Sequence, residues 1–209
     1  MRDRAGRHAG RQLQQQSKAR RARAGAGDRR LAAKNLTAPR VRRGRAGDVD
    51  SLVAIERACF RTDRMARRAF AWFLTHANAD VLCLTVGGDV VGCAIVAYRN
   101  GHHIARLYTL AVLPALQGRG FGTRLLAAAE RAARKHGCSA LRLEVRMRNR
   151  AARAMYERRG YRQIERLDPY YEDGAPALRM ERVFNVPAKT RSRSRLQSPR
   201  SAAPRSRMQ

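Results

Sequence analysis

The stretch LPALQGRGFGTRLLAAAERAARKHG, residues 113–137, places three glycines directly in front of a helix-forming run of Ala, Leu and Arg. Glycine costs backbone entropy on folding, so a cluster of glycines marks a tight bend or a close approach of another group. Gly118, Gly120 and Gly122 follow the apolar run HIARLYTLAV, and the helical run ends at Gly137. The order strand, glycine loop, helix presents consecutive backbone N–H groups to an anion. We therefore expect a phosphate-bearing ligand at this loop.

Two common phosphate-binding loops do not fit this stretch. A P-loop requires G-x-x-x-x-G-K-[ST], and no lysine follows the glycines here. The dinucleotide-binding fingerprint is G-x-G-x-x-G, whereas residues 118–122 have the pattern G-x-G-x-G. On the loop alone, a glycine-rich turn without a ligand therefore stays open as the alternative.

Upstream of the loop, the sequence predicts a strand, two helices and a hairpin. RVRRGRA favours an opening strand, and DVDSLVAIERACF favours a helix with Asp48 as its N-cap. A second helix is expected from Met65 to His76. VLCLTVGGDVVGCAIVAYR then predicts two apolar strands joined by the turn GGD, which is typical of a hairpin.

Downstream of the loop, the pattern continues with a strand, a short helix and two closing strands. ALRLEVR alternates, so Leu143 and its apolar neighbours point inward while Glu144 faces the other way. Asn149 is expected to cap a short helix that Gly160 ends, and YRQIERL and ALRMERVF supply the last strands. This mixture of helices and strands indicates an α+β or α/β fold layered around a central sheet.

The distribution of charge along the 209 residues sets the expected domain limits, because the formal net charge is +29. Residues 1–38 hold 11 Lys and Arg against 2 acids, and residues 184–209 hold 7 against none. Both ends are poor in the branched and aromatic residues that build a core, so residues 1–38 and 185–209 are expected to be disordered extensions around one folded domain, residues 39–184. Basic extensions attract polyanions, so non-specific nucleic-acid or ribosome contact is the alternative to plain solvated sequence.

Other classes of protein receive no support from the sequence. The four cysteines show neither C-x-x-C spacing nor a paired Cys/His cluster, so we expect no disulfide framework and no metal site. No apolar run approaches the ~20 residues of a membrane span, and the N-terminal residues lack the apolar segment of a secretory signal. These features favour a cytoplasmic protein.

Two segments together resemble one acetyltransferase superfamily. QGRGFG, residues 117–122, is similar to the Q/R-x-x-G-x-G/A loop of the GCN5-related N-acetyltransferases (GNAT), whose backbone amides hold the pyrophosphate of acetyl-CoA. LRLEVRMRNRAARAMYERRGYRQ resembles the L-E-V-R-x-x-N-x-x-A-x-x-x-Y-x-x-x-G-F/Y segment of that superfamily, especially of the bacterial ribosomal-protein-alanine N-acetyltransferases. The resemblance covers about residues 40–183. It implies the GNAT fold, an α+β, three-layer α/β/α arrangement with a mixed, mostly antiparallel sheet that is splayed between the strand ending at Val112 and the strand carrying Glu144.

The resemblance implies catalytic roles for two side chains. Glu144 matches the general base of the family, which takes the proton that the attacking amine must lose. From the residues alone, an ion pair between Glu144 and a nearby arginine is the competing interpretation. Tyr156 matches the tyrosine that protonates the thiolate of coenzyme A, although an aromatic residue near a helix end also packs in a core.

The resemblance also implies contacts with acetyl-CoA, the co-substrate. Residues 110–112 correspond to the strand whose main chain pairs with the pantetheine arm, and the amide of Val112 would then stabilise the oxyanion. The expected coenzyme-binding residues are Leu110, Ala111, Val112, Gln117, Gly118, Arg119, Gly120, Phe121, Gly122, Thr123 and Asn149.

The acetyl acceptor is less closely defined. The segment CFRTDRMARRAFAWF lacks the F-P-W-S-like element of ribosomal alanine acetyltransferases, while the loop DPYYEDGAPA makes Tyr170 and Tyr171 candidate acceptor contacts, a plain surface turn being the alternative. The expected reaction is acetyl transfer by direct attack in a ternary complex, to the N-terminal α-amine of a protein or peptide. The alternatives are an acetyltransferase for a small-molecule amine and a nucleic-acid- or ribosome-binding protein that uses the fold as a scaffold.

Overall fold

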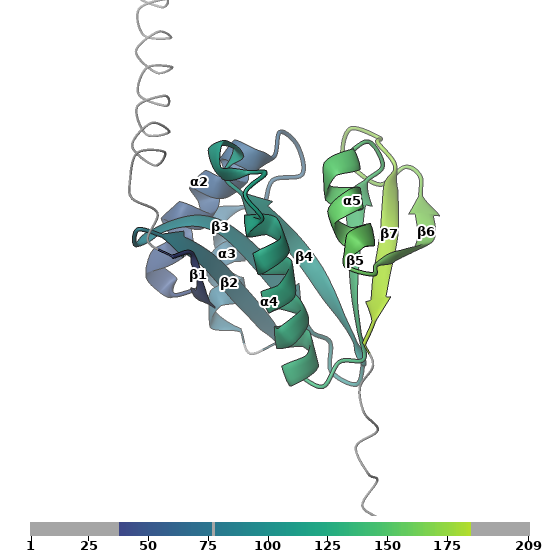
Figure 1. Ribbon diagram of the computed structural model, residues 1–209, viewed down its shortest axis with the longest axis horizontal. Helices are drawn as coiled ribbons and strands as arrows, with labels where there is room; N and C mark the ends of the chain where they lie inside the picture. Colours follow the sequence, from purple (N-terminus) through teal and green to yellow (C-terminus); the bar gives the residue numbers. More distant parts are fainter. Residues whose placement is uncertain (1–37, 77, 185–209) are drawn as a thin grey trace, which may run out of the picture.

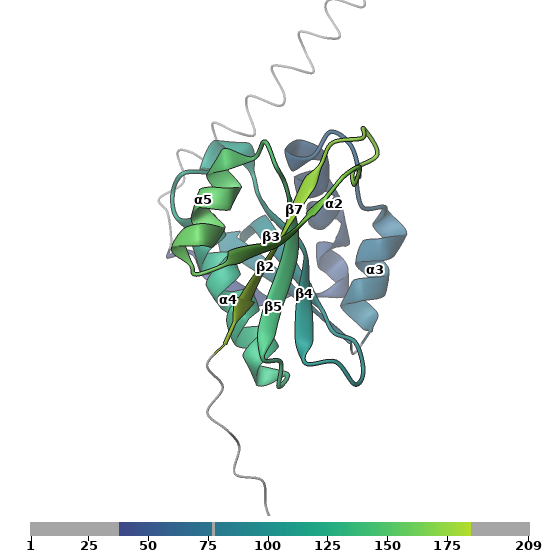
Figure 2. The ribbon, with the colours of Figure 1, turned by 90° about the vertical axis from the view of Figure 1, so that its right-hand side faces the viewer.

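The computed structural model describes residues 38–76 and 78–184, which form a seven-stranded sheet with helices on both faces (Figures 1 and 2). The strands are β1 (Arg40–Arg43), β2 (Ala79–Val86), β3 (Asp89–Ala97), β4 (Ile104–Val112), β5 (Ala140–Arg146), β6 (Arg162–Leu167) and β7 (Ala177–Val183). The helices are α2 (Val49–Cys59), α3 (Arg67–Thr75), α4 (Phe121–Lys135) and α5 (Arg150–Arg158), with short 3-10 turns at Ala46–Asp48 and Pro114–Leu116. The expected disordered ends lie outside the described residues, except for Ala38.

The strands follow the order β1-β2-β3-β4-β5-β7-β6. Every neighbouring pair is antiparallel except β4 with β5, which are joined through α4 and run parallel. A parallel pair needs a long crossover connection, and the helix after the glycine loop supplies it. The prediction of a mixed, mostly antiparallel sheet in a three-layer α+β fold is therefore confirmed.

The sheet is splayed in its middle, as predicted. We call the gap between β4 and β5 the splay. Parallel pairing joins β4 residues 104–107 to β5 residues 140–143, and no pair joins the two strands beyond Leu107 and Leu143. Figure 1 shows the two strands separating from that point. Because β7 pairs with β5 from Ala140 to Arg146, the sheet consists of two well-paired halves that meet at one end.

Two helical layers cover opposite faces of the sheet (Figure 2). Alternate residues of the central strands belong to two separate apolar clusters, because successive side chains on a strand point to opposite faces of the sheet. Cys83 and Ile95 pack with Phe70 under α2 and α3, whereas Leu84 and Leu125 belong to the cluster under α4 and α5. The two clusters fix the sheet between its helices and so fix the position of the splay.

α2 begins at the predicted place, but Asp48 does not cap it. The carboxylate of Asp48 makes no cap hydrogen bond with α2. It accepts two bonds from the guanidinium of Arg42, at 2.7 and 2.8 Å, and one from the backbone N–H of Arg45, at 2.7 Å. The bond with Arg42 lowers the pKa of Asp48 to about 2, against the opposing effect of partial burial. Asp48 therefore occupies the predicted N-cap position, but the expected side-chain bond is absent because Arg42 of β1 binds the same carboxylate.

The other helix ends agree with the sequence to within two residues. α3 begins at Arg67 rather than at Met65, because the N–H of Met65 donates to the Glu56 carboxylate at 3.0 Å and stays in the preceding loop. Asn149 caps α5 as predicted, since its Oδ1 accepts from the N–H of Ala152 at 3.1 Å.

Candidate functional site

The glycine loop leads into α4 through two left-handed residues. Gly118 and Gly120 have φ of 76° and 77°, which an L side chain rarely adopts. Gly120 is the N-cap of α4, and the first turn holds neither a side-chain cap bond nor an acidic residue. The N–H groups of Phe121, Gly122 and Thr123 in that first turn therefore have no intrahelical acceptor. Such a helix start fits a phosphate group, because the free donors and the helix dipole act together.

Gly122 has a packing role that the sequence interpretation did not include. A Cβ at this position would lie 3.2 Å from Sδ of Met155 and 3.9 Å from Cδ2 of Leu110. The missing side chain therefore lets the start of α4 approach both α5 and β4 closely. This contact joins the helix start to the strand at the splay.

Two polar side chains of this segment donate to main-chain carbonyls. The amide of Gln117 donates to the carbonyl of Val112 at 3.0 Å, so Gln117 has only its main chain to offer a ligand. Arg124 donates to the carbonyl of Pro39 at 2.7 Å. Arg119 is exposed. The loop thus resembles a main-chain cradle more than a cluster of charges.

The register of β4 leaves the backbone N–H and C=O groups of two of its residues facing the gap between β4 and β5. Gly92 pairs with Val112, and the N–H of Leu113 donates to the carbonyl of Val91 at 2.9 Å, so Val112 belongs to a pair without mutual hydrogen bonds. The N–H and C=O of Val112 therefore point away from β3, and by the same alternation so do those of Leu110. Ala111, between them, bonds toward β3. Of the three strand residues predicted to contact the coenzyme, Leu110 and Val112 present main-chain groups to the splay.

Glu144 lies on β5 between two arginines of the neighbouring strands. Its side chain is 7% exposed, with Oε2 at 2.9 Å from Nη2 of Arg106 and Oε1 at 3.0 Å from Nε of Arg179. The ion pairs that the sequence left open are therefore present, and their partners come from the neighbouring strands β4 and β7. Arg106 contacts Oε2 and Arg179 contacts Oε1, so these bonds leave an acceptor position free on Oε1.

Tyr156 lies on the opposite side of the sheet from Glu144. It is buried on α5, in the apolar cluster that also contains Leu143 and Val145, the inward neighbours of Glu144. Burial raises the pKa of Tyr156, so its phenol is protonated at neutral pH. Glu144 and Tyr156 thus lie on opposite faces of the sheet, Glu144 in ion pairs with two arginines and Tyr156 buried in an apolar cluster.

The two predicted acceptor tyrosines lie on the Glu144 side. The hydroxyl of Tyr170 accepts a hydrogen bond of 2.8 Å from Arg106, which also binds Glu144, so one guanidinium connects both residues. The ring of Tyr171 lies 3.9 Å under the guanidinium carbon of Arg146. The structure therefore brings the tyrosine loop, β4 and β5 together around one carboxylate.

A set of contacts that the sequence did not reveal joins the two loops beside this carboxylate. Arg146, at the end of β5, donates to Thr62 at 2.6 Å, to Asp63 at 2.7 Å and to Asp173 at 2.8 Å. The N–H of Glu172 donates to Asp63 at 2.8 Å. We call these five residues the loop latch, because they fasten the α2–α3 loop to the β6–β7 loop. Hydrogen bonds from Arg146 lower the pKa of Asp173 and so favour its charged form.

Glu56 is a second carboxylate that sequence reasoning missed. It is buried on the sheet-facing side of α2, and its Oε2 has no hydrogen-bond partner among the described residues. Burial raises the pKa of Glu56. One turn further on, the thiol of Cys59 donates to the carbonyl of Val112 at 3.3 Å, so this face of α2 reaches the end of β4. An acid among the apolar positions of a predicted amphipathic helix was the available signal.

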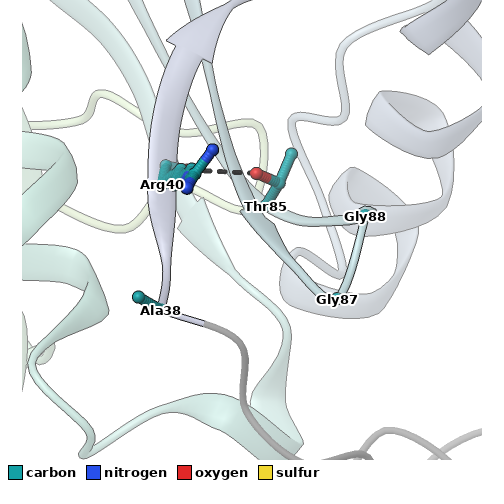
Figure 3. Close-up of a pocket in the computed structure, with 5 residues that line it drawn as sticks. All are labelled: Ala38, Arg40, Thr85, Gly87 and Gly88. Atoms are coloured by element: carbon teal, nitrogen blue, oxygen red, sulfur yellow. Dashed lines mark hydrogen bonds between the residues drawn. The ribbon is translucent and has the colours of Figure 1, made fainter.

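A hollow in the described part of the chain lies away from the predicted site residues. This hollow of about 510 Å³ lies at the outer edge of the sheet, where Thr85 donates to the carbonyl of Arg40 at 3.3 Å (Figure 3). None of the predicted site residues lines it. Within residues 38–76 and 78–184, no three His, Cys, Asp or Glu side chains are grouped to hold a metal ion, and no helix is long and apolar enough to cross a membrane.

Comparison with known proteins agrees with this arrangement. Residues 49–161 match the sequence model of the family described as Acetyltransferase (GNAT) family. An uncharacterised N-acetyltransferase of Methanocaldococcus jannaschii is 34% identical over 143 residues, covering 67% of this chain and 88% of that protein. An N-alpha-acetyltransferase of Sulfurisphaera tokodaii is 30% identical over 152 residues, covering 68% and 90% respectively. The crystal structure of the ribosomal-protein-S18-alanine N-acetyltransferase from Escherichia coli superimposes with a TM-score of 0.66 at 26% identity, covering 73% of this chain and 98% of that one.

Proposed function

Because this chain belongs to the GNAT family of acetyltransferases, we propose that it uses acetyl-CoA to acetylate the N-terminal α-amine of a protein or peptide. The observation that carries the proposal is the alignment of two sets of unpaired main-chain donors. One set is the start of α4 at residues 121–123, and the other is the strand edge at Leu110 and Val112. The acceptor class is supported by the names of two similar proteins, which are an N-alpha-acetyltransferase and a ribosomal-protein-alanine N-acetyltransferase.

The coenzyme would be held mainly by backbone groups. Phe121, Gly122 and Thr123 would donate to the diphosphate, and the left-handed Gly118 and Gly120 keep side chains out of its way. Leu110 would hydrogen-bond the amide-bearing arm in place of a neighbouring strand, and the N–H of Val112 would face the thioester oxygen. When bound, the coenzyme supplies an acetyl thioester, which is the acyl donor.

The side chains around the splay would move the protons that the reaction requires. Glu144 would take one proton from the acceptor ammonium, and the neutral nitrogen would then attack the thioester carbonyl carbon and form the new N–C bond. The N–H of Val112 would stabilise the negative oxygen of the tetrahedral arrangement. The C–S bond breaks as Tyr156 protonates the departing sulfur. Its neutral phenol, maintained by burial, is the form that this step needs. The nitrogen would lose its second proton to solvent when the C–S bond breaks, and Tyr156 would regain from solvent the proton that it gives to the sulfur.

A protein N-terminus fits the surroundings of Glu144 better than a polycationic amine. Arg106 and Arg179 bind the carboxylate directly, and the chain as a whole carries a net charge of +29. Like charges oppose the approach of a polyamine or an aminoglycoside. A small amine with little positive charge is the second candidate. The nucleic-acid alternative depends on the basic extensions, which lie outside the described residues.

The first test is a screen for acceptors with the full-length protein. Peptides that differ in their first residue, and a panel of small amines, are incubated with acetyl-CoA, and release of coenzyme A is measured. Mass spectrometry then locates the acetylated nitrogen. Acetylation of a peptide α-amine supports the proposal, whereas turnover of small amines alone contradicts it.

The roles of the two side chains are tested by Glu144→Gln and Tyr156→Phe. Loss of a general base or acid is expected to lower kcat on the order of 10²–10⁴-fold. Glu165→Gln is the matched control, because Glu165 also pairs with Arg179 but lies on β6, away from the splay. If both site variants keep full turnover from pH 6 to 9, the assigned roles are wrong.

A further inference from the structure

Two exposed aromatic side chains, with a buried one between them, lie beside the proposed site on one face of the sheet. Tyr108 of β4 is 52% exposed and Trp72 of α3 is 49% exposed, although both are large. Phe73 lies between them, with its ring centroid 5.2 Å from that of Tyr108 and 5.0 Å from that of Trp72. We call Trp72, Phe73 and Tyr108 the aromatic row. Exposed apolar side chains that touch one another mark an interaction surface more often than scattered ones do.

The aromatic row is continuous with the carboxylate at the splay. The guanidinium of Arg106 lies 5.6 Å from the ring centroid of Tyr108, and the same group binds Glu144 and Tyr170. Tyr170 is itself 38% exposed. Arg106 therefore connects Glu144 on β5 to the exposed ring of Tyr108 on β4, and the buried ring of Phe73 connects Tyr108 to the exposed ring of Trp72 on α3.

The loop latch obstructs the other approach to Glu144. The α2–α3 loop and the β6–β7 loop meet beyond the end of β5, where Arg146 binds Asp63 and Asp173 and where Glu172 binds Asp63. Figure 2 shows the loop before β7 reaching across toward α2. A polypeptide whose first nitrogen lies at Glu144 would therefore meet these bonds beyond the end of β5, and the exposed rings of Tyr108 and Trp72 beside β4.

On these grounds we infer that the aromatic row binds the acceptor polypeptide downstream of its acetylated residue. The inference rests on the proposed function, and it adds the part of the acceptor that determines selectivity. From the guanidinium of Arg106 to the ring of Trp72, the centroid steps amount to no more than about 16 Å. An extended chain advances ~3.3 Å per residue, so this length accommodates at most about five residues. The row therefore contacts residues that lie within about the second to the sixth position of the acceptor.

The chemistry of the aromatic row favours apolar or aromatic side chains on the acceptor. Ring faces and edges bind other rings and aliphatic groups, and half-exposed rings gain most when a partner removes them from water. Arg106, the charged group next to the row, is already paired with Glu144, so it does not demand an acid from the acceptor. Short amines end before they reach Tyr108. The surface thus serves a polypeptide and not a metabolite.

The test compares three acceptors that share the best first residue found in the screen. One is an octapeptide with Leu and Phe at positions 3–6, the second is the same octapeptide with Ser at those positions, and the third is the N-terminal dipeptide amide. With the parent protein we expect kcat/KM for the apolar octapeptide to exceed that for the other two by at least tenfold. Interface aromatic residues commonly contribute this much or more.

Variants of the row show whether Trp72 causes this preference. Trp72→Ala is expected to reduce the ratio of kcat/KM for the apolar octapeptide to that for the dipeptide by about tenfold, mainly through KM, and Trp72→Phe should restore most of it. Ile164→Ala, which truncates an equally exposed side chain on β6, should leave the ratio unchanged. Equal kcat/KM for all three peptides, or an unchanged ratio in Trp72→Ala, would overturn the inference while leaving the proposed function intact. Turnover of no peptide at all would overturn both.

Discussion

Gly92→Ala is a small change that tests whether the geometry at the end of β4 controls acetyl transfer. Gly92 lies on β3 opposite Val112. A Cβ added there would lie 2.8 Å from the carbonyl oxygen of Ala111, 3.1 Å from Cδ1 of Leu125 and 3.2 Å from Cγ2 of Val112. Ordinary contact begins at 3.4 Å, so β4 must move by about 0.6 Å. The nearest contact is with backbone, which cannot rotate away as a side-chain end can.

The expected cost follows from that displacement. Overpacking by one methyl group typically costs roughly 1–3 kcal/mol, so the free energy of unfolding should fall by that amount and Tm by about 3–10 °C. The movement also shifts the N–H of Val112, and a misplacement of about 1 Å costs on the order of 10²-fold in rate. We therefore expect kcat to fall at least tenfold for a displacement of about half that size, with coenzyme A affinity also reduced.

Differential scanning calorimetry, titration with coenzyme A and steady-state kinetics measure these three effects. Gly47→Ala is the matched control, because a Cβ there meets no atom within 4 Å. A Gly92→Ala protein with unchanged Tm and unchanged kcat would show that β4 is not held as closely as the structure indicates. Lower Tm with unchanged kcat would separate packing from catalysis and remove Val112 from the proposed mechanism.

Three further changes address the charged groups. Asp48→Asn should destabilise the protein by roughly 2 kcal/mol at pH 7, since the pKa of Asp48 is lowered to about 2 by Arg42, and one pKa unit corresponds to about 1.4 kcal/mol. That stability is present above about pH 4 and is lost as the pH falls toward 2, so acid denaturation curves of parent and variant should converge there. Glu130→Ala leaves Arg159 and Arg182 without their buried partner, so the free energy of unfolding measured with urea should fall by about 2–4 kcal/mol. An unchanged urea midpoint would contradict this expectation. Glu56→Gln keeps an acceptor for the N–H of Met65 but cannot ionise. Because the pKa of Glu56 is raised, the free energy of unfolding of the parent falls as the pH rises from about 4.5 through that pKa. The free energy of unfolding of the variant should therefore rise relative to that of the parent between pH 4 and pH 8. A difference between the two that does not change with pH would contradict this.

The elements of the fold were predictable because their signals are local. The turn at Gly87 and Gly88, the cap at Asn149 and the glycines before α4 each depend on neighbouring residues and on backbone conformations that few side chains allow. The alternation in β5 likewise placed Glu144 on the face opposite to Leu143. Periodicity and turn chemistry therefore sufficed for the order of strands and helices, and the family resemblance added the splay.

The partners of the charged residues were not predictable in the same way. Asp63 and Glu172, which bind each other in the loop latch, are 109 positions apart in sequence. The partner of Asp48 is closer in sequence, since Arg42 lies six positions before it, but cap chemistry alone did not identify this competitor. Such contacts depend on which loops the completed sheet brings together, and no local pattern records that. Gly122 shows the same limit, because its contact with Met155 appears only when α5 packs on α4.

The half-paired strand β4 has a consequence for how its ligand preference depends on sequence. Beyond Leu107 the strand has a free edge inside the sheet, and a molecule that carries amide groups can take the place of the next strand there. The groups that would do the binding belong to the backbone, so exchanging one branched side chain for another at Leu110 or Val112 does not remove them. Only a residue without an N–H, such as proline, would delete a donor. Affinity at this edge is thus a property of strand register, and it tolerates a wide range of side chains.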